Sequence, residues 1–207
     1  MKDNRLKEQV LKNIREALME RNEHQQECDT SVGSANTFVG DDVNDISVLF
    51  AQNFTRRGGT MYYCHNEANI SLRIKEIQHQ HGDIDICCGS ENLVTFLENL
   101  GIKGTCLSEP DKRFPLGAIL CEALIAWQGG VVISTNQGLG TTMPALTDSI
   151  IVLAFTSQVV ADWEAAYERM KLLYSDMPDQ IMITNPYSYA YRKGTQKIYL
   201  ILIEDEE

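Results

Sequence analysis

Long apolar runs are missing from this sequence. No apolar stretch approaches the roughly 18 residues that a transmembrane helix requires, so no membrane span is expected. The first ten residues, MKDNRLKEQV, contain no apolar core of the kind that a secretory signal peptide carries. The sequence therefore predicts a cytoplasmic protein.

Positive charge is scarce as well. The 207 residues contain 18 Lys and Arg against 29 Asp and Glu, which gives a formal net charge of −11 at pH 7. A chain this acidic repels the phosphates of nucleic acids and the headgroups of anionic membranes. We therefore expect no nucleic acid and no membrane among its partners.

Metal-binding and disulfide motifs are also missing. The six cysteines are scattered, none forms C-x-x-C, and no histidine stands at zinc-finger spacing from a cysteine pair. His79 and His81 lie two apart on an expected helix and would not face one site. A disulfide scaffold is not expected at this length. The sequence thus predicts no metal site, no cofactor and reduced cysteines.

Three common motifs of catalytic and nucleotide-binding sites are missing or incomplete. The sequence has neither the Gly-Lys-Ser/Thr of a Walker loop nor a G-x-S-x-G elbow. Gly138 and Gly140 begin a G-x-G-x-x-G pattern, but Met143 occupies the third glycine position. Catalytic residues therefore stay unassigned, and whether the protein is an enzyme stays open.

What the sequence does contain is an alternation of short apolar strands and amphipathic helices. Strands are expected at 60–64, 83–88, 102–108, 131–134, 150–155, 180–184 and 197–203. Helices are expected near 6–18, 41–57, 70–81, 91–101, 116–127 and 161–174, and the acidic tail 204–207 is expected to be solvated and frayed. This pattern is typical of an α/β fold with an open, largely parallel twisted sheet flanked by helices. The length favours an N-terminal helical segment, 1–26, and a single α/β domain, 27–207.

A glycine-rich stretch, WQGGVVISTNQGLGTTMP, occupies 127–144. Its backbone N–H groups could form a nest for an anionic small molecule, with hydroxyl and amide side chains as further partners. The alternative is that its glycines only supply positive φ angles between two buried strands. The candidate ligand-binding residues are Gly129, Gly130, Ser134, Thr135, Asn136, Gln137, Gly138, Gly140 and Thr141, joined by Asn185 and Ser188 from a tyrosine-rich segment.

Other candidates each have a simpler alternative. Arg56 and Arg57 could hold an anion, or they could only end a helix before Gly58 and Gly59. Cys88 lies at the end of an expected strand and could edge a pocket or act as a nucleophile, whereas buried structural cysteine is the commoner case. Possible acid, base or anion-binding groups that are more simply surface residues are Lys112, Arg113 and Glu122.

Four segments carry short patterns that point to one known family. VLKNIREAL (10–18) is similar to an opening helix, and LIAWQGGVVIS (124–134) to an Ala-x-Ala-Glu-Thr-Gly-Thr strand and turn. AFTSQVVADWEAA (154–166) carries a Gln, Val and Asp pattern, and ITNPYSYAY (183–191) aligns with Ile-x-Gly-Pro-Ser-Arg-Thr-Ala-Asp. Together they resemble the LUD-domain family, typified by lactate-utilisation protein C. The family's charged residues are replaced, with Trp127 and Gln128 standing at its Glu-Thr.

The resemblance implies a fold like that of glucosamine-phosphate isomerases, ribose-phosphate isomerases and CoA transferases. It also implies an accessory, non-redox role beside iron–sulfur partner subunits in the oxidation of L-lactate, because the partners carry the cysteine-rich cluster motifs. Two alternatives stay open. One is an enzyme or sensor that binds a phosphorylated, CoA-linked or carboxylate ligand. The other is an assembly protein, with a homodimer formed through the N-terminal helix.

Overall fold

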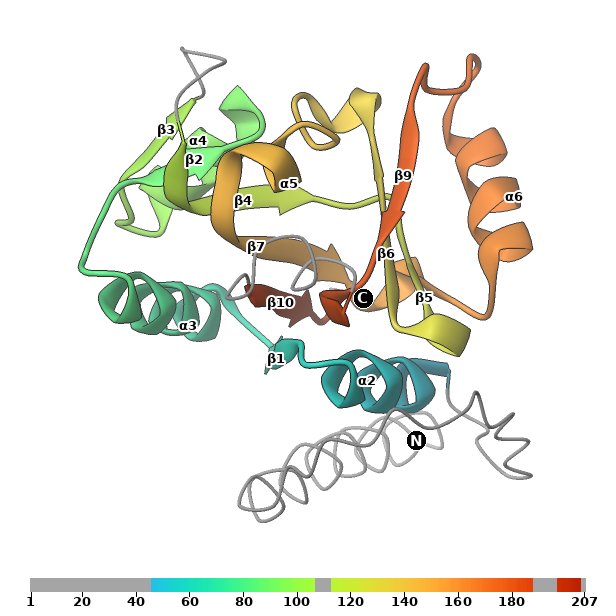
Figure 1. Ribbon diagram of the computed structural model, residues 1–207, viewed down its shortest axis with the longest axis horizontal. Helices are drawn as coiled ribbons and strands as arrows, with labels where there is room; N and C mark the ends of the chain where they lie inside the picture. The colour runs from blue at the N-terminus through green and yellow to red at the C-terminus, as the bar shows by residue number, and fades with distance from the viewer. Residues whose placement is uncertain (1–45, 107–112, 188–196, 206–207) are drawn as a thin grey trace.

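The computed structural model describes residues 46–106, 113–187 and 197–205, and a six-stranded parallel sheet forms its centre (Figure 1). The order of the strands across this sheet is β1-β10-β7-β4-β2-β3. Their bounds are β1 Thr60–Cys64, β10 Lys197–Ile203, β7 Thr147–Phe155, β4 Phe114–Leu120, β2 Ile86–Cys88 and β3 Gly104–Cys106. The expected largely parallel sheet flanked by helices is confirmed. The predicted helix at 6–18 and the candidate Ser188 lie outside the described residues.

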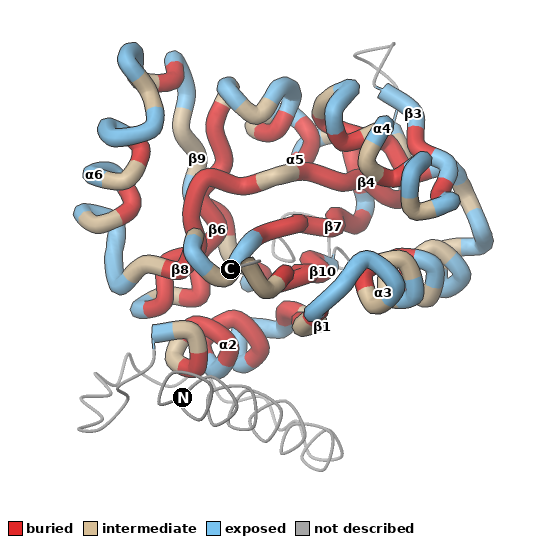
Figure 2. The backbone as a smooth tube through the Cα atoms, turned by 180° about the vertical axis from the view of Figure 1, so that it is seen from behind, coloured by how far each residue is buried: buried red, intermediate tan, exposed pale blue. Residues whose placement is uncertain are grey.

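Helices cover both faces of this sheet. Along β7, Ile150 and Val152 pack on one face while Ile151 and Leu153 pack on the other, as the two-residue period of a strand requires. Helix α2 (Ile46–Arg56) covers the first face, and α3 (Glu67–Gln80) and α4 (Glu91–Asn99) cover the second. The strands read as continuous apolar runs because both faces are buried (Figure 2).

Local signals in the sequence set the helix ends. The side chains of Asn66 and Ser90 accept hydrogen bonds from the first turns of α3 and α4. Asp162 does the same for α6 (Trp163–Leu173). At the other end of α2, Gly58 has a φ of 93°, so this glycine supports the helix-end interpretation of 56–59.

The prediction of a helix at 116–127 is wrong. This segment forms the rest of β4, then β5 (Ala123–Ile125) and the start of a short 3₁₀ turn, η1 (Ala126–Gln128). Leucine and alanine favour helices in isolation, but here the strand is buried on both faces and the apolar pattern has no period. Gly117 fits the sheet closely, since a Cβ there would lie 2.5 Å from the Thr147 Cγ2 atom.

A second, four-stranded sheet was not foreseen from the sequence. Its order is β8-β5-β6-β9, with β8 at Val159–Val160, β6 at Gly130–Ser134 and β9 at Ile181–Thr184. β4 leads almost directly into β5, and β7 leads through η3 (Thr156–Gln158) into β8, so this sheet stands beyond the carboxyl ends of central strands (Figure 1). Ala166 and Met170 of α6 pack on it. Among the described helices, none has the length and apolar character needed to cross a membrane.

Candidate functional site

A cleft of about 290 Å³ lies at the carboxyl ends of β1, β10 and β7. This end of a parallel sheet is where α/β proteins commonly bind ligands. Two neighbouring strands, β1 and β10, each continue into polar residues here, because His65 follows Cys64 and Glu204 follows Ile203. The cleft is lined by His65, Asn66, Glu67, Ile70, Phe96, Phe155, Ile203, Glu204 and Asp205.

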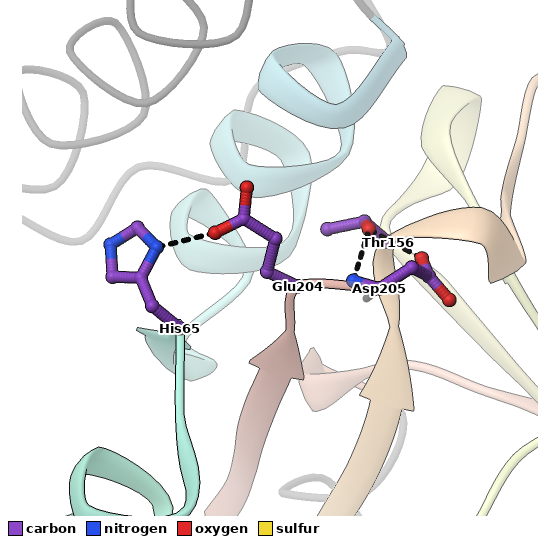
Figure 3. Close-up of polar contacts among 4 residues, drawn as sticks. All are labelled: His65, Thr156, Glu204 and Asp205. Carbon is purple, nitrogen blue, oxygen red and sulfur yellow. Dashed lines mark hydrogen bonds and ion pairs between the residues drawn. The ribbon is translucent and has the colours of Figure 1, made fainter. Parts of the chain in front are cut away.

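His65 and Glu204 form the closest polar pair of the cleft (Figure 3). The distance from His65 Nδ1 to Glu204 Oε2 is 2.5 Å, and the side chains are 32% and 17% exposed. An ionised carboxylate only accepts, so Nδ1 carries the proton of this hydrogen bond. The Tyr63 ring packs edge-on against the imidazole, with 4.8 Å between the ring centroids. Burial raises the pKa of Tyr63, and the nearby Glu204 carboxylate raises it further.

Asp205 ties the end of β10 to the turn that follows β7 (Figure 3). Its Oδ2 accepts from the Thr156 hydroxyl at 2.6 Å and from the Ser157 backbone N–H at 2.7 Å. Its Oδ1 accepts from the Ser157 hydroxyl at 2.9 Å. Burial raises the pKa of Asp205, but these hydrogen bonds to the ionised form outweigh it and lower the pKa overall. The expectation that the acidic tail is frayed is therefore wrong for Glu204 and Asp205.

The chemistry of the cleft suits a small ligand with polar and apolar parts. Carboxylates of Glu67, Glu204 and Asp205 can accept hydrogen bonds or attract a cation. The apolar walls come from Ile70, Phe96, Phe155 and Ile203. Such a lining favours hydroxyl or ammonium groups over phosphate groups, because like charges repel at close range.

A second polar cluster lies next to the glycine-rich stretch. Glu122 is only 2% exposed, so the interpretation of this residue as a surface residue is wrong. The buried Ser134 hydroxyl donates to Glu122 Oε1, and the Tyr174 hydroxyl donates to Oε2 at 2.9 Å. Gln137 Nε2 donates to the Tyr174 oxygen at 3.4 Å. Of the candidate ligand-binding residues, Ser134 thus contacts the carboxylate directly and Gln137 reaches it through Tyr174. This satisfied network joins β6 to the end of α6.

The Glu122 carboxylate also perturbs its tyrosine neighbour. Burial, followed by the hydrogen bond to Glu122 and its negative charge, raises the pKa of Tyr174 to about 12. The phenol is therefore neutral at physiological pH and acts as a donor.

Glycines of the stretch are held by close packing. Gly129 has a φ of 56°, and a Cβ there would lie 2.5 Å from the Phe54 backbone nitrogen in α2. Gly138 has a φ of 70°, and its Cβ would lie 2.3 Å from the Gly89 carbonyl oxygen. These contacts account for both glycines by the alternative weighed above, positive φ and close approach. Ligand binding by this stretch stays a prediction.

The remaining predicted ligand-binding residues differ in their exposure. The candidates Thr135, Asn136 and Gln137 form the 3₁₀ turn η2 after Ser134. Thr135 pairs with Gln180, whose carbonyl accepts from its backbone N–H at 3.1 Å. The buried candidates are Gly130 and Gly140, and the half-buried candidates are Thr141 and Asn185.

The two cysteines that end the expected strand at 83–88 are structural in character. Cys87 and Cys88 are both fully buried in β2. Burial raises the pKa of Cys87 to about 11 and that of Cys88 to about 12, so neither carries a significant thiolate population at neutral pH. Among the described residues, no three His, Cys, Asp or Glu side chains are placed to hold a metal ion.

Sequence reasoning missed the residues that line the cleft. His65 is isolated from the other histidines in the sequence, and Glu204 and Asp205 belong to the tail that is expected to be solvated. A usable signal is present, since His65 and Glu204 each follow directly after an expected strand, at 60–64 and 197–203. The neighbouring positions of the two strands in the sheet were not available from the sequence.

Comparison with known proteins shows the fold of this chain. No family profile matches the sequence, and no match was found among curated proteins. The structure is similar to that of a DUF162 family protein from Deinococcus radiodurans, with a TM-score of 0.60 and 14% identity over 76% of this chain and 96% of that chain. A ribose 5-phosphate isomerase from Plasmodium falciparum aligns over 56% of this chain and 54% of its own, with 10% identity and a TM-score of 0.31, from which we draw no conclusion.

Proposed function

We propose that this chain is a divergent LUD-domain protein with an accessory, non-redox role in L-lactate utilisation. The proposal is carried by the fold it shares with the DUF162 family protein, because DUF162 is the LUD-domain family. The patterns at 124–134, 154–166 and 183–191 support it from the sequence. Electron transfer would belong to iron–sulfur partner subunits, and the site of action would be the cytoplasm, where cysteines stay reduced.

Co-purification tests this role directly. The full-length chain, tagged and expressed at its natural level, is isolated from cells grown on L-lactate and from cells grown on another carbon source. The expected result is enrichment of iron–sulfur proteins, with iron and acid-labile sulfide in the eluate, from the lactate-grown cells alone. An eluate without any cluster-bearing protein under both conditions rejects the accessory role.

A second candidate function is the binding of a small molecule, which the cleft at His65 and Glu204 favours. Its acidic and apolar lining suits a hydroxylated or amine-bearing ligand. The glycine-rich stretch remains the candidate for a phosphorylated, CoA-linked or carboxylate ligand. The two sites therefore favour opposite ligand charges, and this difference makes the candidates separable.

Thermal unfolding with a ligand panel separates these sites. The panel contains neutral sugars, amines, sugar phosphates, acyl-CoAs and 2-hydroxy acids. A ligand at 100 times its Kd should stabilise the fold by about 2.7 kcal/mol. Glu204→Gln should abolish the shift for a cleft ligand, and Thr141→Val should abolish it only for a ligand of the glycine-rich stretch. A panel that leaves the melting temperature unchanged rejects ligand binding of these classes.

A further inference from the structure

Both tryptophans of the chain lie at the surface, on neighbouring segments. Trp127 in η1 is 64% exposed, and Trp163 at the start of α6 is 39% exposed. The Trp127 backbone N–H donates to the Ala161 carbonyl at 3.1 Å, which places residue 127 beside the chain two residues before Trp163. Tyr167 is 36% exposed, and its ring lies 5.9 Å from that of Trp163. Large aromatic side chains gathered on a surface are typical of protein interfaces.

The turn that carries Trp127 is held rigidly. Asn53 in α2 donates from Nδ2 to the Ala126 carbonyl at 2.8 Å and to the Trp127 carbonyl at 3.1 Å. Gly129 closes the turn against the α2 backbone, with no room for a Cβ. The backbone of Trp127 is thus fixed on both sides by hydrogen bonds, and its indole is presented without a flexible loop. A preorganised aromatic anchor loses little entropy when it binds.

Negative charge borders the aromatic surface. Asp162 and Glu164 flank Trp163 in the chain and are both exposed. Neither forms an ion pair with any residue in the described part of the chain. On α6, Lys171 already pairs with Glu168 at 2.8 Å, and Arg169 donates to the Ser157 carbonyl at 3.0 Å. Asp162 caps α6 by accepting from the Ala165 N–H, so the charges next to Trp163 that have no cationic partner in the described residues are acidic.

We propose that Trp127, Trp163 and Tyr167 anchor a partner protein that presents an apolar pocket bordered by lysine or arginine. The acidic residues at the rim of this surface favour a partner with positive charge and steer its approach. A second copy of this chain is the less suitable occupant, since a two-fold contact through this surface would set Asp162 and Glu164 against their own copies. This aromatic surface is the one that the accessory role proposed above would use, and its assignment to a partner rests on that role.

Site-specific photo-cross-linking tests the surface in the full-length protein. Benzoylphenylalanine replaces Trp127 or Trp163, and a control variant carries it at Leu72, which is 53% exposed on α3. The expected result is a cross-link from positions 127 and 163, and not from 72, to a different protein, at a peptide rich in lysine or arginine beside apolar residues. Cross-links to a second copy alone, equal cross-linking from Leu72, or no adduct overturn the proposal.

A quantitative measurement follows with the partner identified in this way. Trp127→Ala and Trp163→Ala should each weaken its binding more than tenfold, while Leu72→Ala leaves it unchanged. Unchanged melting temperatures check that the variants remain folded. Unchanged affinity in both tryptophan variants overturns the anchor assignment. If the cross-linked partner holds no iron–sulfur cluster, the surface stands and the lactate role fails, so the two proposals are separable.

Discussion

Two carboxylates that follow the carboxyl ends of central strands, Glu204 after β10 and Glu122 after β4, have opposite environments. Glu204 lines a cleft, is 17% exposed, and pairs with the partly exposed imidazole of His65. Glu122 is sealed at 2% exposure and is held by neutral hydroxyl donors from Ser134 and Tyr174. The Glu204–His65 pair leaves polar atoms accessible to a ligand in the cleft. The Glu122 carboxylate instead has its hydrogen bonds satisfied inside the protein, and its network stiffens the second sheet. Both residues are glutamates, so burial and the identity of the hydrogen-bond partner distinguish a ligand-accessible carboxylate from a structural one.

The largest expected effect comes from Gly129, in the turn of the second sheet that packs against α2. Gly129→Ala would place a Cβ 2.5 Å from the Phe54 backbone at a φ of 56°. We expect a loss of about 3 kcal/mol or more in unfolding free energy, from overpacking and backbone strain together. Gly58→Ala is the matched control, because its φ is 93° and no atom lies within 4 Å of the added Cβ. Urea denaturation that gives equal losses for both would contradict close packing at Gly129.

The two carboxylates themselves should differ in their cost of removal. Glu122→Ala leaves the buried Ser134 donor and the half-buried Tyr174 donor without their acceptor, and we expect a loss of about 2–3 kcal/mol. Glu204→Ala removes a more exposed pair and should cost about 1 kcal/mol. Denaturation at pH 7 measures both values. If Glu204→Ala lowers the free energy of unfolding more than Glu122→Ala does, the assignment of Glu122 as the structural carboxylate is wrong.

An alkaline pH dependence should mark the second cluster. The pKa of Tyr174 is raised to about 12, so its stabilising effect is complete below the unfolded pKa of about 10 and is lost as pH rises towards the folded value. The difference in unfolding free energy between wild type and Tyr174→Phe should be constant at neutral pH and shrink above about pH 10. A constant difference up to about pH 11 would mean that Tyr174 ionises alike in both states.

An acidic dependence, the smallest effect expected, should mark the cleft. The pKa of Asp205 is lowered in the folded state, so its contribution is present above the unfolded pKa of about 3.9 and is lost as pH falls through the folded value. The stability difference between wild type and Asp205→Asn should therefore shrink on acidification below about pH 4. Denaturation from neutral to acidic pH measures it. A difference that grows on acidification would contradict the role of Thr156 and Ser157 as donors to the carboxylate.

The sequence predicted strand positions well and three-dimensional neighbours poorly. Runs such as TMYYC and KIYLILI became β1 and β10, because β-branched and aromatic residues suit a buried strand. The segment at 116–127 failed, since continuous burial removes the period that distinguishes strand from helix. Two strands of the second sheet, β6 and β9, match expected strands at 131–134 and 180–184, but β5 and β8 are short continuations of β4 and β7 and were missed, so the sequence did not indicate a separate sheet.

For the candidate site, too, the sequence predicted local residues and missed their three-dimensional neighbours. Ser134 and Gln137 were selected as polar residues of a glycine-rich stretch, and they do contact one polar cluster, but its centre is Glu122. His65 and Glu204 are separated by 139 residues, so their contact depends on the order of the strands. Local sequence patterns carry no information on that order.

The position of β10 has a consequence for the timing of folding. This strand comes last in the described chain, yet it lies between β1 and β7, pairing in parallel with both. The two flanking strands cannot complete their hydrogen bonds, and His65 cannot meet Glu204, until this segment has left the ribosome. Nascent chains would therefore expose two apolar strand edges, which is when aggregation competes most strongly with folding.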